Sequence, residues 1–355
     1  MSQNWLRHFE LQLLDDNGNG ITLSDFRVTF NIDWYNTSTQ TRIGTIKIYN
    51  LSENTTNKIM GKEFSKVRVI AGYKGVVPIV DESQAGQVRE VAPNHLGQMD
   101  GQNYGLIFSG EIRYSLTGKE NPVDSYVIIQ AADGAQAFVS AMSNQTLAAG
   151  YTVADLNKAL MNDFSPYRVT EGQTPEMPST VFPRGRTVFG MTRDLMDNVA
   201  TQCNATWMFV DGKREMVRAG EYTHEAIVLK SRTGLIGMPQ QTIGNGVNVR
   251  CLINPNIRVN GLIQLDQGSV YRTSLSNNDI AMSDGRITDQ ENNGNVTVSG
   301  VTAQPASIAT DGVYVVKGIM YTGDTRGQAW YMDMICEARG AADIQSKWYQ
   351  DKVSV

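Results

Sequence analysis

Two segments of the sequence could, by residue type and spacing, begin a calcium-binding loop. An EF-hand loop takes oxygen ligands from positions 1, 3 and 5, has glycine at 6, and closes the coordination sphere with a bidentate glutamate at 12. Residues 15–20, DDNGNG, meet the first half of this pattern, but position 12 is Phe26. Residues 289–300, DQENNGNVTVSG, fail in the same way, because Gly300 stands where the glutamate belongs. The sequence therefore predicts no metal site, and the Asn-Gly pairs of the first segment predict a tight turn between strands.

Motifs for catalysis are missing from the sequence as well. It has no GxSxG, HExxH or P-loop, and GNGVNV at 244–249 lacks the third glycine of a dinucleotide-binding loop. The histidines, His8, His95 and His224, stand in unrelated contexts, which favours surface or turn positions. Carboxylate pairs for glycoside hydrolysis are set in three dimensions, and 36 acidic residues give chance pairs. We predict no catalytic, cofactor-binding or metal-binding residue, no cofactor and no enzymatic activity.

Composition narrows the class of protein further. The net charge is −5, and Lys and Arg are scattered, which argues against tight binding of a phosphate backbone. Cys203, Cys251 and Cys336 lie far apart without a CxxC pair, so we expect free buried thiols rather than disulfides or a zinc site. No apolar run approaches the roughly 20 residues of a membrane span, and the first residues lack the apolar core of a signal peptide. We expect no membrane insertion.

Strand patterns dominate residues 1–134. Alternating or continuous apolar residues occur in FRVTFNIDWY, IGTIKIYNL, KVRVIAGY, YGLIFSGEIRYSL and DSYVIIQAAD. Several of these segments are long, which favours a bent sheet that curls into a barrel. Ser52 is a candidate N-cap for a short helix in SENTTNKIM. Residues 75–103 lose the apolar rhythm and predict a long loop or a small hairpin excursion.

The period changes over residues 135–222. Apolar residues three and four apart predict helices in GAQAFVSAM, TVADLNKALMNDF and GMTRDLMDNVATQC, and in the last of these Met191, Leu195 and Val199 share a face. Thr152 and Asp155 resemble a capping box.

A hairpin is predicted to end this segment, in ATWMFVDGKREMVRAG, with its turn at Asp211 and Gly212. The pattern as a whole predicts a small α/β module.

Strand patterns return over residues 223–355. They occur in AIVLKS, VNVRCLI, GLIQLD, GVYVVKGIMYTGD and QAWYMDMICEA. Residues 267–312 form a polar insert, rich in Asn, Ser, Asp and Gly, that cannot build a core and is expected to be partly ordered or to fold back as a hairpin. The predicted fold is mainly β with an α/β module, which lies between two β domains.

Several segments, taken in sequence order, resemble the baseplate hub proteins of contractile-tailed bacteriophages. Three segments are similar to the first barrel of that family: RIGTIKIYNLSENTTNKI, VRVIAGYKG and IFSGEI. Three later segments are similar to its second barrel: TGLIGMPQQT, VRCLINPNIRVNGLIQLD and GDTRGQAWYMDMICEA. The resemblance extends over most of the chain. It implies two tube-type β-barrel domains that flank the middle α/β domain.

The resemblance also implies an assembly. Three subunits with two similar barrels each would match the six-fold tail tube to the three-fold spike, as a closed heterologous ring. The implied partners are two further copies, a tail tube protein, a spike protein and, as further candidates, baseplate wedge and tape-measure proteins. DNA would pass through the channel without specific binding, and an inner surface lined with arginines would contradict this. The implied location is the tail baseplate of the virion, after assembly in the host cytoplasm.

Five segments or residues are candidates for contacts between subunits. Residues 254–256, Asn-Pro-Asn, predict a bend between strands, with a lip between subunits as the alternative. Residues 323–327, GDTRG, predict a hairpin loop that could also be a contact surface. Trp330, Trp348 and Tyr349 are placed either in the core or at an interface, where aromatic residues contribute strongly.

Two other functions remain open from the sequence. The chain could be a spike or tube component of a related injection machine, although it has no repeat-rich C-terminal β-helix. It could also be a cell-wall glycan hydrolase or glycan-binding protein built on β domains, which would need a groove with converging carboxylates and aromatic residues.

Overall fold

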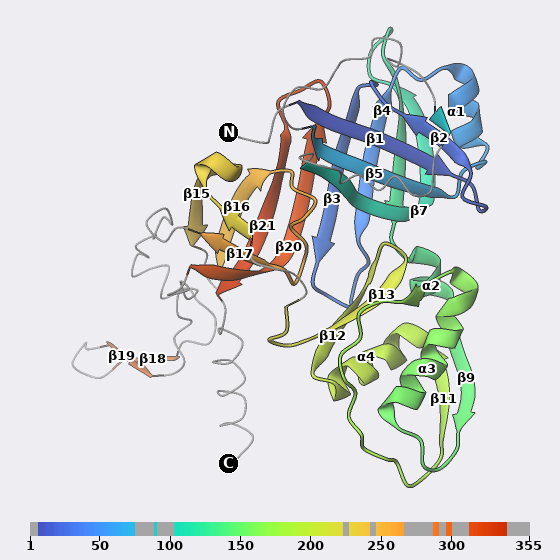
Figure 1. Ribbon diagram of the computed structural model, residues 1–355, viewed down its shortest axis with the longest axis vertical. Coiled ribbons are helices and arrows are strands. Elements are labelled where there is room, and N and C mark those ends of the chain that lie inside the picture. Colours follow the sequence, from blue (N-terminus) through green and yellow to red (C-terminus); the bar gives the residue numbers. More distant parts are fainter. Residues whose placement is uncertain are drawn as a thin grey trace.

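The structure is a computed structural model. It describes residues 6–74, 89–90, 103–222, 227–241, 246–265, 287–290, 296–299 and 312–338. Figure 1 shows a large β assembly, built from the two ends of the described chain, and a separate module with helices beside it. The predicted fold class, mainly β with an α/β module, is confirmed.

The first β region contains eight strands and one helix. They are β1 (Arg7–Leu14), β2 (Gly20–Leu23), β3 (Val28–Tyr35), β4 (Ile43–Tyr49), α1 (Glu53–Met60), β5 (Lys66–Tyr73), β6 (Arg89–Glu90), β7 (Asn103–Lys119) and β8 (Ser125–Ala132). The DDNGNG turn joins β1 to β2, which pair antiparallel. Ser52 caps α1 by accepting a hydrogen bond from the Thr55 backbone N–H, as predicted.

In the predicted excursion 75–103, Arg89–Glu90 pairs with β2, and residues 75–88 and 91–102 lie outside the described part.

Strand β7 turns a corner between two layers. Its first half, up to Glu111, pairs with β5, and its second half, from Glu111 onward, pairs with β8. Both ladders contain a bulge close to this point, which allows the long strand to bend. As a result β1, β5 and the start of β7 cross over β3 and β4 (Figure 1). The core lies between these crossing layers.

The second β region supplies the other strands. They are β14 (Ile227–Leu229), β15 (Leu235–Gln241), β16 (Val247–Leu252), β17 (Leu262–Leu265), β18 (Ile287–Gln290), β19 (Val296–Ser299), β20 (Val313–Asp324) and β21 (Trp330–Ala338), with the 3₁₀ turn η3 (Ser231–Thr233). Strands β18 and β19 form an antiparallel hairpin within the predicted polar insert. The other residues of 267–311 lie outside the described part.

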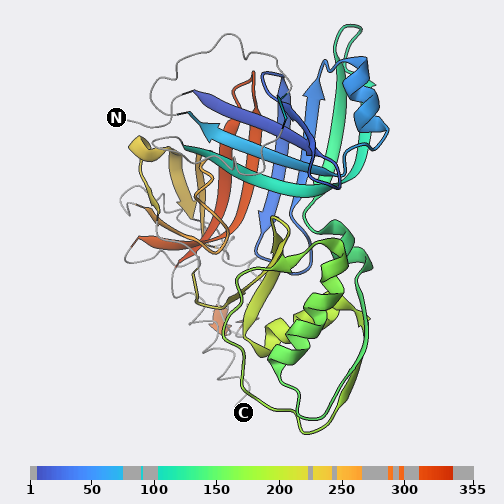
Figure 2. The same cartoon turned by 45° about the vertical axis from the view of Figure 1, so that its right-hand side comes forward.

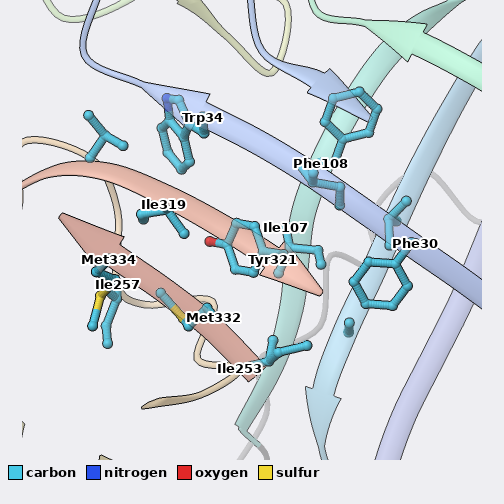
Figure 3. Packing of buried hydrophobic residues seen from close by; sticks show 14 of the residues in the cluster. Phe30, Trp34, Ile107, Phe108, Ile253, Ile257, Ile319, Tyr321, Met332 and Met334 are labelled. Carbon is cyan, nitrogen blue, oxygen red and sulfur yellow. The ribbon is translucent and has the colours of Figure 1, made fainter. Parts of the chain in front are cut away.

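The two β regions are joined into one sheet. Strand β3 pairs antiparallel with β20, from Tyr35 opposite Gly318 to Thr29 opposite Asp324. The described pairings then run without a break through β15, β16, β21, β20, β3, β4, β8 and β7. One hydrophobic core takes side chains from both regions, and Figure 3 shows Phe30 and Trp34 beside Tyr321 and Met332. The two regions therefore share a single interior.

The middle module has its own core. Its elements are α2 (Ala135–Ser140), β9 (Met142–Leu147), α3 (Val153–Phe164), η2 (Ser165–Tyr167), β10 (Thr170–Glu171), β11 (Arg186–Met191), α4 (Thr192–Gln202), β12 (Ala205–Val210) and β13 (Lys213–Arg218). Residues 137–216 supply the second hydrophobic cluster, centred on Trp207 and Phe164. The capping box of Thr152 and Asp155 is present, and Asp211-Gly212 forms the predicted hairpin turn. Figure 2 shows the module with its helices below the two β regions.

The predicted helix face of Met191, Leu195 and Val199 is wrong at Met191, whereas Val199 is buried and Leu195 packs against the same core. Helix α4 begins at Thr192, so Met191 is its N-cap, and Leu195 is only half-buried. The buried face is formed by Thr192, Met196, Val199 and Ala200. The error arises because Met191 ends β11 and pairs with Met142 there. In the described part of the chain no helix has both the length and the apolar character needed to span a membrane.

Candidate functional site: the open face of the continuous sheet

The residues whose types could bind a metal have structural roles within the fold. The Asp15 carboxylate accepts hydrogen bonds from the backbone N–H groups of Asn17 and Asn19, both at 2.8 Å, and so builds the turn. Among the described residues no group of three or more His, Cys, Asp or Glu side chains could hold a metal ion. The predicted turn is confirmed. The second candidate calcium loop, residues 289–300, lies partly in β18 and β19 and partly outside the described residues.

The described histidine is not a surface residue. His8 is buried in β1, where its Nε2 lies 2.9 Å from Glu10 Oε1 and its ring packs on Tyr104. The predicted surface or turn position is therefore wrong for His8, because Tyr104 of β7 packs against its ring. His95 and His224 lie outside the described residues.

The three cysteines are free and buried, as predicted. Burial raises the pKa of the Cys251 and Cys336 thiols above its ordinary value, which keeps both thiols protonated and unreactive.

In the part of the sheet that runs from β15 to β7, one face points away from the core, and we call it the open face. Eight strands contribute to it. One straight row of paired residues crosses all eight, and we call it the charged row: Ile236, Arg250, Asp333, Met320, Asp33, Ile43, Ala132 and Glu111. The next row crosses seven strands and is the uncharged row: Leu252, Tyr331, Thr322, Asn31, Thr45, Gln130 and Tyr114.

The basic side chains of the open face are paired with acids. Arg250 forms a bidentate pair with Asp333, with Nε at 2.6 Å from Oδ1 and Nη2 at 3.0 Å from Oδ2, and it stacks on Tyr331. The pKa of Arg250 is raised, mainly by this hydrogen bond. Lys47 lies 3.0 Å from Glu120. A surface whose cations are neutralised in this way offers little attraction to a phosphate backbone.

The loop after β20 clamps the two β regions together. Thr325 Oγ1 donates to the Phe26 carbonyl at 2.8 Å and accepts from the Val28 N–H at 2.9 Å. Arg326 donates to the Asp25 carbonyl, and Arg7 donates to carbonyls of the same loop, including Gln328 at 3.1 Å. Residues 323–327 were predicted as a hairpin loop first and a contact surface second. The hairpin loop is confirmed, with the contacts within the chain given above, and the contact surface between subunits stays a prediction.

The middle module is attached through the tip of its β12–β13 hairpin, which we call the hairpin-tip junction. Asp211 lies 3.0 Å from Arg42 of the first β region and 3.2 Å from Arg258 of the second. The Arg42 guanidinium is buried, stacks on Trp34 and donates to the Ile107 carbonyl at 2.7 Å. One carboxylate therefore connects all three parts of the chain.

A second carboxylate supports this junction from β8. Asp133 accepts the backbone N–H groups of Asp211, at 2.6 Å, and Gly212, at 3.0 Å. Burial raises the pKa of Asp133 to about 7, although Arg42 and the two N–H donors act in the opposite direction. No local pattern in the sequence could have indicated this cluster, since its members are far apart in the chain. The positive φ values of Asp211 and Gly212 make the sharp turn that presents both N–H groups.

The aromatic and proline candidates fall in the interior where they are described. Trp330 is buried and packs edge-on against Phe30. Pro255 is also buried, in the bend between β16 and β17, so the bend is confirmed and the lip between subunits is untested. Trp348 and Tyr349 lie outside the described residues.

Comparison with known proteins gives a fold but no sequence family. No family model matches the chain, and no curated protein matches it. The 43 kDa tail protein of prophage MuSo2 from Shewanella oneidensis superimposes with a TM-score of 0.52 at 7% identity, over 94% of this chain and 98% of that one. The chain has the fold of a phage tail protein.

Two further solved structures are similar at lower scores. A tail protein from Neisseria meningitidis MC58 matches with a TM-score of 0.48 at 9% identity, over 94% of this chain and 97% of that one. The c3393 protein of E. coli, described as a component of the type VI secretion system, matches with a TM-score of 0.43 at 9% identity, over 91% and 77%.

Proposed function

We propose that the chain is a structural hub protein of a contractile phage tail baseplate. In this proposal three copies form a ring between the six-fold tail tube and the three-fold spike, and the open face lines the channel through which DNA passes. The observation that carries it is a run of eight neighbouring strands within the described 14-stranded sheet, to which each β region contributes four: β7, β8, β4 and β3 from the first, and β20, β21, β16 and β15 from the second. Beyond β7 the sheet continues through β5, β1, β2 and β6 of the first region. Two β regions that each supply four strands to this run allow three copies to imitate a ring of six.

The side chains of the open face support a passage rather than a binding surface. The uncharged row has no ionisable side chain except the phenols of Tyr331 and Tyr114, and Arg250 and Lys47 are paired with acids. DNA that slides past such a face meets no row of free cations. The other partners in the proposal are a tube protein, a spike protein and neighbouring baseplate proteins, and the chain itself is not an enzyme.

The solution mass tests the ring. Multi-angle light scattering, combined with negative-stain images, should give a mass of three chains and a three-fold ring with six lobes. Because neighbouring tail proteins could be needed for assembly, the measurement is repeated with the tube protein added. A monomer under both conditions would refute the hub. Release of peptidoglycan fragments by the purified protein would favour a glycan hydrolase instead.

A second experiment tests the channel surface. We expect the wild-type protein to leave double-stranded DNA unshifted in a gel at physiological salt. Replacing Asn31 and Thr322 of the uncharged row by arginine should create DNA binding that weakens steeply with added salt. The control carries the same two arginines at Thr146 and Thr187, on the exposed face of the β9–β11 pair in the middle module. If wild-type protein binds DNA strongly, the open face is not a neutral passage.

A further inference from the structure

Strands β9 and β11 of the middle module form a two-stranded ribbon that is longer than the strands themselves. Residues 142–147 pair antiparallel with residues 186–191. The bridge between Thr152 and Val181 continues the same register, so we call residues 142–152 and 181–191 the ribbon. Within the described part of the chain, β9 and β11 pair with no further strand. Unpaired backbone N–H and C=O groups at such an edge are a template for another strand.

One face of the ribbon is covered by the module and the other is bare. Ser143 and Val188 are buried, and Val188 belongs to the module's core. Side chains alternate along a strand, so Met142 and Phe189 lie on the opposite face, where they are 56% and 70% exposed. Val139, near the end of α2 and just before β9, is 57% exposed. Figure 1 shows β9 and β11 on the side of the module opposite to β12 and β13.

Two exposed arginines stand at the start of β11. Arg186 is its first residue and Arg184 precedes it by two positions, and neither forms an ion pair with a described residue. Arg250 and Lys47 of the open face, in contrast, are paired with acids. Phe189 follows Arg186 by three residues, which is roughly 10 Å along a strand. A partner that carries an acidic and an apolar side chain at about this spacing would match both.

Strand β11 has room for the backbone of a partner. Gly190 has a φ of 143°, a conformation that favours glycine, and a Cβ atom added there would meet nothing within 4 Å. Gly44, inside the continuous sheet, has no such space, because an added Cβ would lie 2.9 Å from the Phe108 ring. A glycine in a strand with open space beside it marks a place where another backbone can approach closely.

We propose that the outer edge of β11 binds an extended segment of another protein as a third strand. In this proposal an acidic side chain of the segment pairs with Arg184 and Arg186, and an apolar side chain covers Phe189 and Met142. Main-chain hydrogen bonds then supply affinity, and the side chains of the segment supply specificity. The inference concerns the middle module and does not depend on how many copies form the ring.

The composition of the ribbon favours this occupant over two others. A nucleic acid would use the two arginines, but its phosphate backbone would leave Phe189 and Met142 uncovered. The ribbon of a second copy has no acidic side chain to offer, because residues 142–152 and 181–191 contain neither Asp nor Glu. An acidic and apolar segment of a different protein matches both the charge and the apolar face.

Selection from a peptide library tests the pattern of the ligand. Displayed random peptides of about 12 residues, long enough to span a strand, are selected on the full-length protein and sequenced. We expect enrichment of peptides in which Asp or Glu stands about two to four residues from a large apolar residue, without proline between them. Enrichment of basic peptides, or of no peptide, would overturn the proposal.

Variants of the ribbon test the site. The most enriched peptide, labelled with fluorescein, is titrated with the protein and followed by anisotropy. Phe189→Ser should weaken binding about tenfold or more, because a buried apolar contact is lost. Arg184→Glu combined with Arg186→Glu should weaken binding by a similar factor, and added salt should weaken binding to the wild type. Circular dichroism of Phe189→Ser should match the wild type, since this side chain is exposed.

Matched controls lie on β7 and on its turn to β8. Val123→Ser removes an exposed apolar side chain, and Arg113→Glu with Lys119→Glu reverses two exposed charges. Both controls should leave the Kd of the peptide within about twofold, because they lie outside the proposed contact. Equal losses from the controls and from the ribbon variants would overturn the assignment of the site.

Hydrogen exchange distinguishes strand addition from contact with side chains alone. Bound peptide should slow the exchange of backbone amides in residues 186–190, and unchanged exchange there would refute a third strand. Competition by double-stranded DNA would assign the arginines to phosphate instead. A solution mass that falls on Phe189→Ser would assign the ribbon to a second copy. Peptide binding by a protein that stays monomeric would leave this inference standing while the hub proposal fails.

Discussion

The two β regions are attached to each other differently from the way the middle module is attached to them. The joint between the β regions is a backbone ladder with a shared apolar core, fixed by neutral hydrogen bonds at Thr325. The hairpin-tip junction instead depends on Asp211, Arg42 and Asp133. The stability of a backbone ladder with an apolar core hardly changes with pH, whereas the stability of a cluster of partly buried charges does change. The structure thus combines a permanent joint with one whose strength follows protonation.

The largest expected effect concerns the permanent joint. Trp330→Ala should lower the free energy of unfolding by about 3–5 kcal/mol, because the indole fills the space beside Phe30 and Phe9 of the other region. Urea denaturation followed by fluorescence measures this. Its neighbour Tyr331 points to the open face, so Tyr331→Ala should cost about 1 kcal/mol or less. Similar losses for the two variants would show that the joint is not held by its core.

The next effect concerns the charged junction. Arg42→Met should lower the free energy of unfolding by about 3 kcal/mol, since it leaves Asp211 and the buried Asp133 without their main cation. Hydrogen exchange should rise first in β12 and β13. Arg258→Met is the control, and it should cost about 1 kcal/mol or less because its guanidinium is partly exposed. Uniform exchange changes over the whole chain would contradict a separate junction.

The pH dependence sharpens the same comparison. The pKa of Asp133 is about 7 in the folded state and about 4 in an unfolded chain. The folded state therefore holds a proton that the unfolded state loses, so this group makes stability fall as pH rises from about 4 to about 7 and leaves it constant above. About three pKa units correspond to a change on the order of 4 kcal/mol. Asp133→Asn should remove this slope, and chemical denaturation at several pH values measures it.

A smaller effect is expected at the loop that clamps the β regions. Thr325→Val removes a donor to Phe26 and an acceptor for Val28, and it should cost about 1–2 kcal/mol. Thr322→Val, three residues earlier on the open face, should change the free energy of unfolding by less than about 0.5 kcal/mol. Thermal unfolding of the two variants, measured in parallel, tests this difference. Equal melting temperatures would show that the loop is not a clamp.

The smallest effect is expected on the open face itself. Arg250→Gln breaks an ion pair whose arginine is half exposed, so it should cost about 0.5 kcal/mol or less. The same variant leaves Asp333 unpaired on the proposed channel surface, so it should leave double-stranded DNA unshifted in a gel, like the wild type. A large loss of stability would show that this ion pair helps to hold the fold together, as the two joints do.

Local signals in the sequence were sufficient for much of the fold. The Ser52 cap, the Thr152 and Asp155 capping box and the Asp211-Gly212 turn each depend on residues within four positions of each other. The alternation in β3 likewise gives its buried face directly. Such features follow from propensity and period, which act over short distances along the chain.

Contacts between distant residues could not be predicted in the same way. The GDTRG loop is composed like any exposed turn, and its clamp on Phe26 and Val28 becomes visible only when β3 is placed beside β20. Arg42 precedes an ordinary strand, and its burial depends on Trp34 and on a hairpin about 170 residues later. His8 was misplaced for the same reason, since Tyr104 covers it from another strand. Burial of a polar residue is decided by its partners.

The pairing of β3 with β20 has a consequence for biosynthesis. Residues 28–35 leave the ribosome long before residues 318–324, and at about 5–20 residues per second the delay is roughly 15–60 seconds. Throughout this interval the edge of β3 that later binds β20 has no partner from its own chain. A nascent chain is therefore most exposed to mispairing with other nascent chains before its last hairpin emerges. Fast translation or a bound chaperone over that period would protect the yield of folded protein without altering the native state.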